Sequence, residues 1–97
     1  MIPNMEAEPV MDDLIPVGDV SFAQLVIWKV PKPVQGSNHL FKYRLAYVVR
    51  DRCVLRYDNE AGKGDHKHCD GIEVAYGFSD LASLQADFWN DVERRRK

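Results

Sequence analysis

Residues 40–58 read LFKYRLAYVVRDRCVLRYD, and their alternation of apolar and polar side chains is typical of a β-hairpin. Before the turn, apolar side chains occupy every second position, at Phe41, Tyr43, Leu45, Tyr47 and Val49. After the turn they occupy Cys53, Leu55 and Tyr57. A three-residue turn at 50–52 places both sets on one face, because a slip of one residue reverses a strand. We therefore predict that turn, with one left-handed residue and with Arg44 opposite Asp58.

The rest of the chain indicates two more strands and a helix. Phe22–Val30 is rich in β-branched and aromatic residues, and Ile72–Phe78 follows an Asp70-Gly71 turn. From Ser79, which we expect to cap it, the helix carries an apolar stripe of Leu81, Leu84, Phe88 and Val92. The fold class we expect is α+β, a small antiparallel β-sheet of about four strands with a C-terminal α-helix packed on one face.

Composition and charge are those of an ordinary globular protein. The chain has 97 residues, 45% hydrophobic and 29% charged, with a net charge of −2, and this length supports a single domain. We expect residues 1–19 to form an acidic, proline-broken arm and residues 20–97 to form the globular core. The absence of a long apolar run and of a signal-peptide pattern leads us to expect a cytoplasmic protein with reduced cysteines.

The middle of the chain is locally basic within an acidic protein. Bases outnumber acids between residues 40 and 68, and Lys42, Arg44 and Arg56 share the polar face of the predicted hairpin. Two compatible interpretations of the arginines remain open, namely salt bridges to Asp58 and contacts with phosphate groups. We assign substrate binding to the residues in or beside this region, Lys42, Arg44, Asn59 and Lys67.

The segment RYDNEAGKGDHKH (56–68) concentrates titrating side chains in what we expect to be a loop bent by two glycines. His66 and His68 alternate, so on an extended segment both point the same way. Imidazoles exchange protons near neutral pH, which suits the general base and acid of RNA cleavage, although plain surface residues remain the alternative. We assign catalysis to the charged and imidazole side chains of this segment, Arg56, Asp58, Lys63, Asp65, His66 and His68.

Metal and nucleotide sites are not expected. DHKHC (65–69) holds several potential ligands, but their spacing departs from the CxxC and HxxxH pairs of structural zinc sites. Adjacent His68 and Cys69 rarely reach one ion. GKG (62–64) is too short for a phosphate-binding loop, and no helix pattern follows it. We therefore predict no metal and no cofactor.

These motifs together resemble the TumE family of toxins from bacterial and archaeal toxin–antitoxin pairs. The resemblance rests on RYDN (56–59), GKGDHKH (62–68), Tyr76 with Phe78, and the helical LxxDFWxDV (84–92). It spans residues 39–93, more than half of the chain.

The resemblance implies a toxin that acts inside the cell as a ribonuclease. It also implies a DNA-binding antitoxin of helix-turn-helix or winged-helix type as the partner. Through the matching motifs it supports roles for Arg56, Asp58, Asn59, Lys63, Asp65, His66 and His68.

Two functions from different classes are expected on this basis. The first is a metal-independent endoribonuclease that leaves a 2′,3′-cyclic phosphate and is neutralised by the antitoxin. The alternative is a non-enzymatic binding module whose basic patch docks an acidic partner or nucleic acid, with the acidic arm 1–19 as a lid. Either is compatible with a homodimer or an antitoxin contact through Phe22–Val30, which we expect at a sheet edge.

Overall fold

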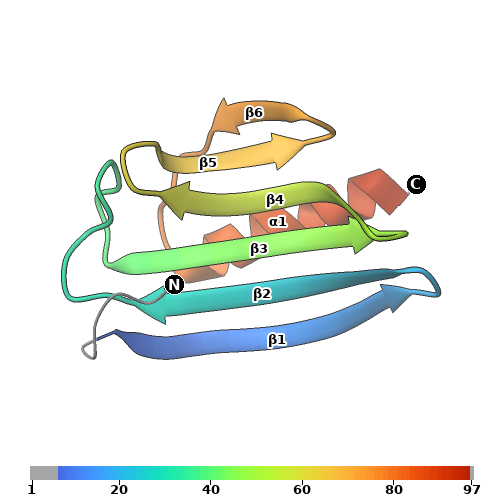
Figure 1. Ribbon diagram of the computed structural model, residues 1–97, viewed down its shortest axis with the longest axis horizontal. Helices are drawn as coiled ribbons and strands as arrows, with labels where there is room; N and C mark the ends of the chain where they lie inside the picture. Colours follow the sequence, from blue (N-terminus) through green and yellow to red (C-terminus); the bar gives the residue numbers. More distant parts are fainter. Residues whose placement is uncertain (1–6, 97) are drawn as a thin grey trace.

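A sheet of six antiparallel strands, crossed on one face by α1, makes up the part of the chain that the structure describes, residues 7–96 (Figure 1). In this computed structural model the elements are β1 (Glu8–Gly18), β2 (Ser21–Lys29), β3 (Phe41–Val49), β4 (Arg52–Glu60), β5 (Gly64–Cys69), β6 (Ile72–Ala75) and α1 (Leu81–Arg96). The strands lie in the sheet in chain order, so each pairs with the next. The α+β class and the C-terminal helix are confirmed, and the sheet has more strands than the four we expected.

The hydrophobic core lies between α1 and the middle of the sheet. The buried face of the helix consists of Leu84, Phe88 and Val92. The strands contribute the alternate apolar positions Ala23, Leu25, Ile27, Tyr43, Leu45, Tyr47, Leu55 and Tyr57. Burying one large apolar side chain contributes about 1.5–3 kcal/mol, so this layer supplies most of the stability. It also determines which face of the sheet remains uncovered.

The β3–β4 hairpin reaches the predicted register by a different turn. Val49 pairs with Arg52, so the turn consists of Arg50 and Asp51 alone, both left-handed with φ of 49° and 66°. A β-bulge follows, with Val54 as the extra residue. A two-residue turn and one bulge give the same offset as a three-residue turn. Arg44 therefore pairs with Asp58 as predicted.

Residues 8–18 form an edge strand rather than the irregular arm that we expected. β1 pairs with β2 along its length, with register shifts beside Pro9 and Pro16. An edge strand tolerates proline because one side of its backbone makes no ladder hydrogen bonds. Met11 and Ile15 pack against the core, an alternation that the acids and prolines obscured in the sequence. The part of the expected arm in residues 1–6 lies outside the described residues.

The position of β1 also bears on two other expectations. Because β2 and β3 separate β1 from β4, residues 8–18 do not lie over Arg44 and Arg56 as a lid. The segment Phe22–Val30 lies mostly in β2, an inner strand, so it offers no sheet edge for dimerisation. Among the described residues, the edges of the sheet are β1 and β6.

The segment 59–68 is a strand pair and not a loop. β4 continues to Glu60, residues 61–63 make the turn, and β5 begins at Gly64. In this pairing His66 lies opposite Asp58. The sequence GDHKHC contains no β-branched residue, so its own strand signal is weak and pairing with β4 determines its conformation. Successive side chains of β5 therefore point to opposite faces of the sheet.

α1 is held by its N-cap and by polar contacts to the sheet. Asp80 caps it, accepting a hydrogen bond from the backbone N–H of Ser83 at 2.7 Å, so the cap is one residue later than expected. The phenol of Tyr76 donates to Asp87 at 2.5 Å. Within residues 7–96, no helix has both the length and the apolar character that crossing a membrane requires.

Candidate functional site

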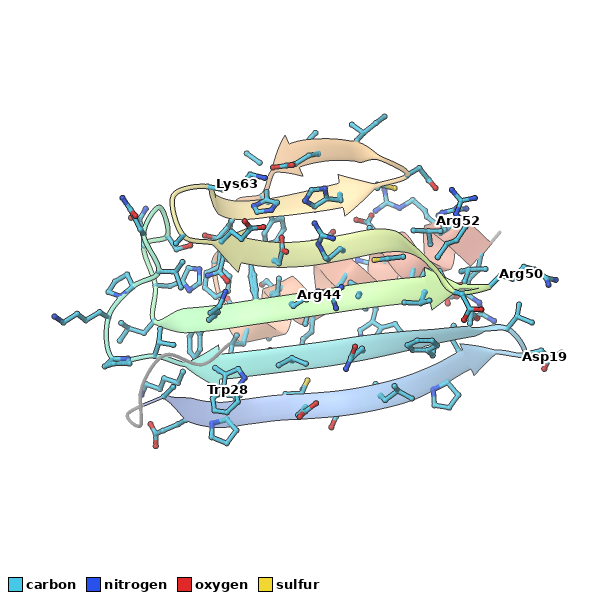
Figure 2. The ribbon with its side chains drawn as sticks, viewed as in Figure 1. Asp19, Trp28, Arg44, Arg50, Arg52 and Lys63 are labelled. Atoms are coloured by element: carbon cyan, nitrogen blue, oxygen red, sulfur yellow. The ribbon has the colours of Figure 1, made fainter. Side chains whose placement is uncertain are left out.

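The face of the sheet opposite α1 carries most of the residues predicted to be catalytic, and Figure 2 is viewed from this side. Cross-strand pairing places Arg44 of β3, Asp58 of β4 and His66 of β5 in one row. Beside it, Arg56 of β4 pairs with His68 of β5. We call this uncovered side the open face. Strand pairing, and not a bent loop, is what brings these side chains together.

Close contacts join these residues into one cluster. His66 Nε2 lies 2.8 Å from Asp58 Oδ1, and Arg56 Nε lies 3.1 Å from Asp58 Oδ2. The rings of His66 and His68 have centroids 5.0 Å apart and meet at 72°. Glu73 of β6 has carboxylate oxygens 3.6 Å from His68 Nε2 and 3.9 Å from His66 Nε2. We call Arg56, Asp58, His66, His68 and Glu73 the open-face cluster.

The open-face cluster contains buried polar atoms without hydrogen bonds. These atoms are Arg56 Nε, Asp58 Oδ1, His66 Nε2 and His68 Nε2. His66 and Asp58 are close, but their orientation does not satisfy hydrogen-bond geometry. A buried polar atom left unpaired costs about 1–3 kcal/mol. A concentration of such atoms at one place is therefore typical of a ligand site rather than of a purely structural contact.

The backbone determines which nitrogen of His66 carries a proton. Nδ1 lies 2.9 Å from the carbonyl oxygen of Gly64. A carbonyl oxygen only accepts hydrogen bonds, so Nδ1 donates, and Nε2 of the neutral ring carries the lone pair. The side chain of His66 is 3% exposed, whereas that of His68 is 24% exposed. His66 is therefore the fixed ring, and His68 is the ring that solvent reaches.

Arg44 is the exposed cation beside the cluster. It projects from β3 on the open face, as Figure 2 shows, and forms no ion pair with any residue in 7–96. Asp58 lies opposite Arg44 but pairs with Arg56 of its own strand. Of the two interpretations of the arginines, the salt bridge therefore applies to Arg56, and Arg44 keeps its guanidinium available for a phosphate.

The two predicted lysines of this region are already engaged. Lys63 lies in the β4–β5 turn, and its Nζ is 3.3 Å from a carboxylate oxygen of Glu73. Lys42 Nζ donates to the backbone carbonyl of Asn59 at 3.2 Å. Lys63 is therefore ion-paired with the cluster, whereas no ion pair within residues 7–96 neutralises the charge of Lys42.

Asp65 lies on the side of the sheet that α1 covers, away from His66. Its carboxylate accepts hydrogen bonds from Ser37 Oγ at 2.7 Å, Tyr43 OH at 2.6 Å and His39 Nε2 at 2.8 Å. Burial acts to raise the pKa of Asp65, but these three hydrogen bonds outweigh it, so the pKa is lowered. His39, expected to be exposed, stacks on Phe78 with ring centroids 3.7 Å apart. This network joins the β2–β3 loop to the sheet.

Asn59 and Lys67 also face the helix side and serve the fold. Asn59 is 1% exposed; its side chain donates to the carbonyl of Phe41 at 2.7 Å and accepts from the N–H of Tyr43 at 3.0 Å. Lys67 Nζ lies 3.0 Å from Asp91 of α1. Because the side chains of a strand alternate between faces, the candidates between Lys63 and His68 divide between two sides of the sheet.

Glu73 is the member of the open-face cluster that we did not predict. The Asp70-Gly71 turn, predicted and confirmed, has φ of 50° and 85°, as a two-residue type I′ hairpin requires. This turn places Glu73 opposite His68. Recognising β5 as a strand would have been enough to find Glu73 from the sequence.

Apolar side chains extend the open face across β2. Trp28 pairs with Lys42, and Val26 pairs with Arg44. Figure 2 labels Trp28 near one end of β2, on the neighbouring strand to Arg44. An indole beside two cations is a surface on which an unpaired nucleic-acid base can stack while its phosphates meet positive charge.

Three members of the open-face cluster bring potential metal-ligand atoms close together. One potential ligand atom from each of Asp58, His66 and His68 lies within 4.8 Å of the other two. Cys69 follows His68 directly, which we took as an argument against a metal site. It packs against the core, on the side of the sheet that α1 covers. The set is therefore two imidazoles and a carboxylate, without a thiol.

Comparison with known proteins agrees with the motifs in the strands and helix. A family model described as Toxin TumE matches residues 6–96, which includes every element of the fold. No curated protein and no solved structure matches the chain. The chain belongs to the TumE family and is thus the toxin of a toxin–antitoxin pair, with an antitoxin as its partner.

Proposed function

We propose that this toxin is an endoribonuclease whose active site is the open-face cluster together with Arg44. The observation that carries the proposal is the convergence of two imidazoles, a carboxylate and guanidinium groups on the uncovered face of a sheet. A sheet holds such side chains rigidly, which proton transfer and phosphate stabilisation both require. Lys67, Asn59 and Asp65 are left out of this site because they face the other side.

The reaction proposed is attack of a ribose 2′-hydroxyl on the adjacent phosphorus. One imidazole accepts the 2′-hydroxyl proton, and the other donates a proton to the departing 5′-oxygen. We give the base role to His68, which is the more exposed ring, and the acid role to His66, which Asp58 accompanies. The products are a 2′,3′-cyclic phosphate and a 5′-hydroxyl, and water later restores the protonation of both rings. The reaction as written uses no metal ion.

Charge and stacking on the same face suit a single-stranded substrate. Arg44 and Arg56 would contact phosphate oxygens and stabilise the charge that develops on phosphorus. Lys42 lies between them and Trp28, whose indole would stack on a base. Duplex RNA offers no unstacked base to Trp28, so we expect single strands to be preferred.

A cleavage assay in EDTA with matched variants tests the proposal. Wild-type toxin should cleave single-stranded RNA, and a His66→Ala/His68→Ala variant should lose about 100-fold or more of the rate. An Arg94→Ala variant is the control, because Arg94 is 77% exposed on α1 and remote from the open face. Wild-type-like cleavage by the double variant would overturn the assignment. A double variant that is inactive on RNA yet equally toxic in cells would favour the binding-module alternative.

We propose that the antitoxin is a DNA-binding protein of helix-turn-helix or winged-helix type and that the toxin acts in the cytoplasm. Membership of the TumE family supports an antitoxin partner. The proposed RNA target supports the cytoplasm as the place where the toxin acts. Purification of the toxin with the product of the adjacent gene, followed by operator binding, tests the first point.

Sedimentation of the toxin alone tests whether it is a homodimer. The exposed β6 edge, with Ile72 at 67% and Val74 at 45% exposure, is the place for that contact.

A further inference from the structure

We propose that the open-face cluster is also a binding site for one divalent transition-metal ion, with Asp58 Oδ1, His66 Nε2 and His68 Nε2 as its ligands. The argument begins with the atoms that lack partners. Four buried side-chain atoms of the cluster lack a hydrogen bond, and the three that are not on Arg56 are all of metal-ligating type. His66 is 3% exposed, so its unpaired nitrogen is aimed into the cluster and not into solvent.

The potential ligand atoms lie close enough together to reach one ion after small side-chain movements. Atoms bound at about 2.0–2.2 Å to the same ion stand roughly 3–3.5 Å apart. Asp58 Oδ1 and His66 Nε2 are 2.8 Å apart, and potential ligand atoms of all three residues lie within 4.8 Å of one another. Small side-chain rotations therefore complete the coordination without movement of the strands.

The tautomer of His66 is set for ligation. Its Nδ1 donates to the carbonyl of Gly64 at 2.9 Å, which leaves a lone pair on Nε2, 2.8 Å from Asp58 Oδ1. Two electron-rich atoms repel each other at that distance unless a proton or a cation lies between them. A histidine whose second nitrogen donates to a backbone carbonyl is the usual arrangement in metal sites.

Charges around the ligands select the kind of ion. Arg56 Nε lies 3.1 Å from Asp58 Oδ2, and its positive charge disfavours a bound cation. Glu73 offsets this charge with a second carboxylate next to both imidazoles. Two imidazoles with carboxylate oxygen suit Zn²⁺ and its neighbours in the first transition row rather than Mg²⁺ or Ca²⁺. Glu73, with oxygens 3.6 Å and 3.9 Å from the two Nε2 atoms, is the candidate for a fourth ligand.

Metal binding would switch off the proposed cleavage, and this consequence rests on the proposed function. An ion that takes the lone pairs of His66 and His68 leaves no imidazole to accept or donate a proton. The site would then act as an inhibitory site, with Zn²⁺ and RNA turnover mutually exclusive. Binding itself does not depend on whether the toxin cleaves RNA.

The test is calorimetric titration of untagged, EDTA-stripped full-length toxin with ZnCl₂, with MgCl₂ as a second titrant. One Zn²⁺ per chain should bind, and Asp58→Asn, His66→Gln and His68→Gln should each weaken binding about tenfold or more. Cys69→Ser and Cys53→Ser are the matched controls and should leave the affinity unchanged, since neither thiol joins the cluster. Zn²⁺ binding retained in His66→Gln/His68→Gln, or lost in a cysteine variant, would overturn the proposal.

The absorption spectrum of Co²⁺ bound to wild-type toxin keeps the test independent of variant folding. Nitrogen and oxygen ligands give visible bands without the intense near-ultraviolet thiolate band, and such a thiolate band would contradict the site. RNA cleavage is then compared in EDTA and with one equivalent of Zn²⁺. Cleavage in EDTA that Zn²⁺ abolishes supports both proposals, whereas unchanged cleavage by the zinc-loaded toxin overturns the inhibitory role. Zinc binding without cleavage in any condition would remove the proposed function and leave the metal site standing.

Discussion

Gly64 shows how a single residue positions the cluster. Its φ is +74°, and a Cβ at this position would lie 2.6 Å from the carbonyl oxygen of Gly36. The carbonyl of Gly64 in turn holds His66. Gly36 and Gly64 therefore let the backbone of the β2–β3 loop contact the backbone at the start of β5. For Gly64, this close contact replaces the hinge role that we expected from the sequence.

A pair of alanine substitutions separates strain from close approach. Gly64→Ala should lower the free energy of unfolding by about 2–4 kcal/mol, because a left-handed φ and a backbone clash add together. Gly62→Ala should cost only about 1 kcal/mol, since Gly62 has φ of +87° but nothing within 4 Å of a Cβ. Urea unfolding of both variants measures the difference. Equal losses would mean that the contact with Gly36 contributes nothing.

Arg44 is where binding can be changed without changing stability. Arg44→Ala should weaken single-stranded RNA binding several-fold and reduce the slope of log K against log salt by about 0.7, the loss of one phosphate contact. The melting temperature should stay constant, because Arg44 is exposed and has no ion pair within residues 7–96. Fluorescence anisotropy across salt concentrations measures the slope. The same loss in Arg94→Ala would show a nonspecific charge effect instead.

At the level of elements, the β3–β4 turn can be improved. Arg50 and Asp51 are both left-handed, a conformation that costs non-glycine residues energy. Replacing them with Asn-Gly, the pair that type I′ turns prefer, should raise the free energy of unfolding by about 0.5–1.5 kcal/mol. The register beyond the bulge should not change. Thermal unfolding tests the gain, and a loss of stability would mean that the two side chains make contacts essential to the hairpin.

The contact between α1 and β4 predicts acid sensitivity. Tyr57 donates a short hydrogen bond to Asp91, and Lys67 lies 3.0 Å from the same carboxylate. Burial acts to raise the pKa of Asp91, but these partners outweigh it and lower it below the usual 3.8. A carboxyl with a lowered folded-state pKa stabilises the fold above its unfolded value and loses that contribution as pH falls through the folded value.

Unfolding measured between pH 6 and pH 2 tests this contact. Wild-type stability should fall as the pH drops below about 4, and Asp91→Asn should be less stable at pH 6 but show a shallower fall. Glu93→Gln is the control, because Glu93 is 60% exposed and forms an ion pair with Arg96 of its own helix. An unchanged acid limb in Asp91→Asn would contradict the role given to Asp91.

The alternation of apolar and polar residues predicted the strands whose apolar side chains all face the core. It did not reveal β1, where prolines and acids interrupt the pattern, or β5, whose side chains are mostly polar. The β3–β4 register followed from Tyr43, Leu45, Leu55 and Tyr57, although the bulge at Val54 replaced the expected turn. β1 was missed because prolines and acids on an edge strand resemble a linker. β5 was missed because its alternation is between polar residues of different roles, which no hydropathy pattern reveals.

For the whole molecule, the sheet separates polar side chains that stabilise the fold from those that face solvent on the open face. The helix side uses Asp65, Asn59 and Lys67 to complete the fold, while the open face presents Arg44 and His68 to solvent. The sequence predicted that Arg56, Asp58, His66 and His68 act together, and the fold brings their side chains close to one another. Their roles stay a prediction. We did not predict that Asp65 and Lys67 face one side while His66 and His68 face the other. We expected 59–68 to be a loop, and only a strand makes successive side chains alternate between faces.

The chemistry of the RNA ends is the most direct test of the proposed active site. RNA cut by wild-type toxin in EDTA should carry a 2′,3′-cyclic phosphate on one fragment and a 5′-hydroxyl on the other, as attack by the neighbouring 2′-hydroxyl requires. A substrate with 2′-deoxyribose at the cleaved position should remain intact. Fragments with 3′-hydroxyl and 5′-phosphate ends, or cleavage of the deoxy-substituted substrate, would contradict proton transfer by His66 and His68.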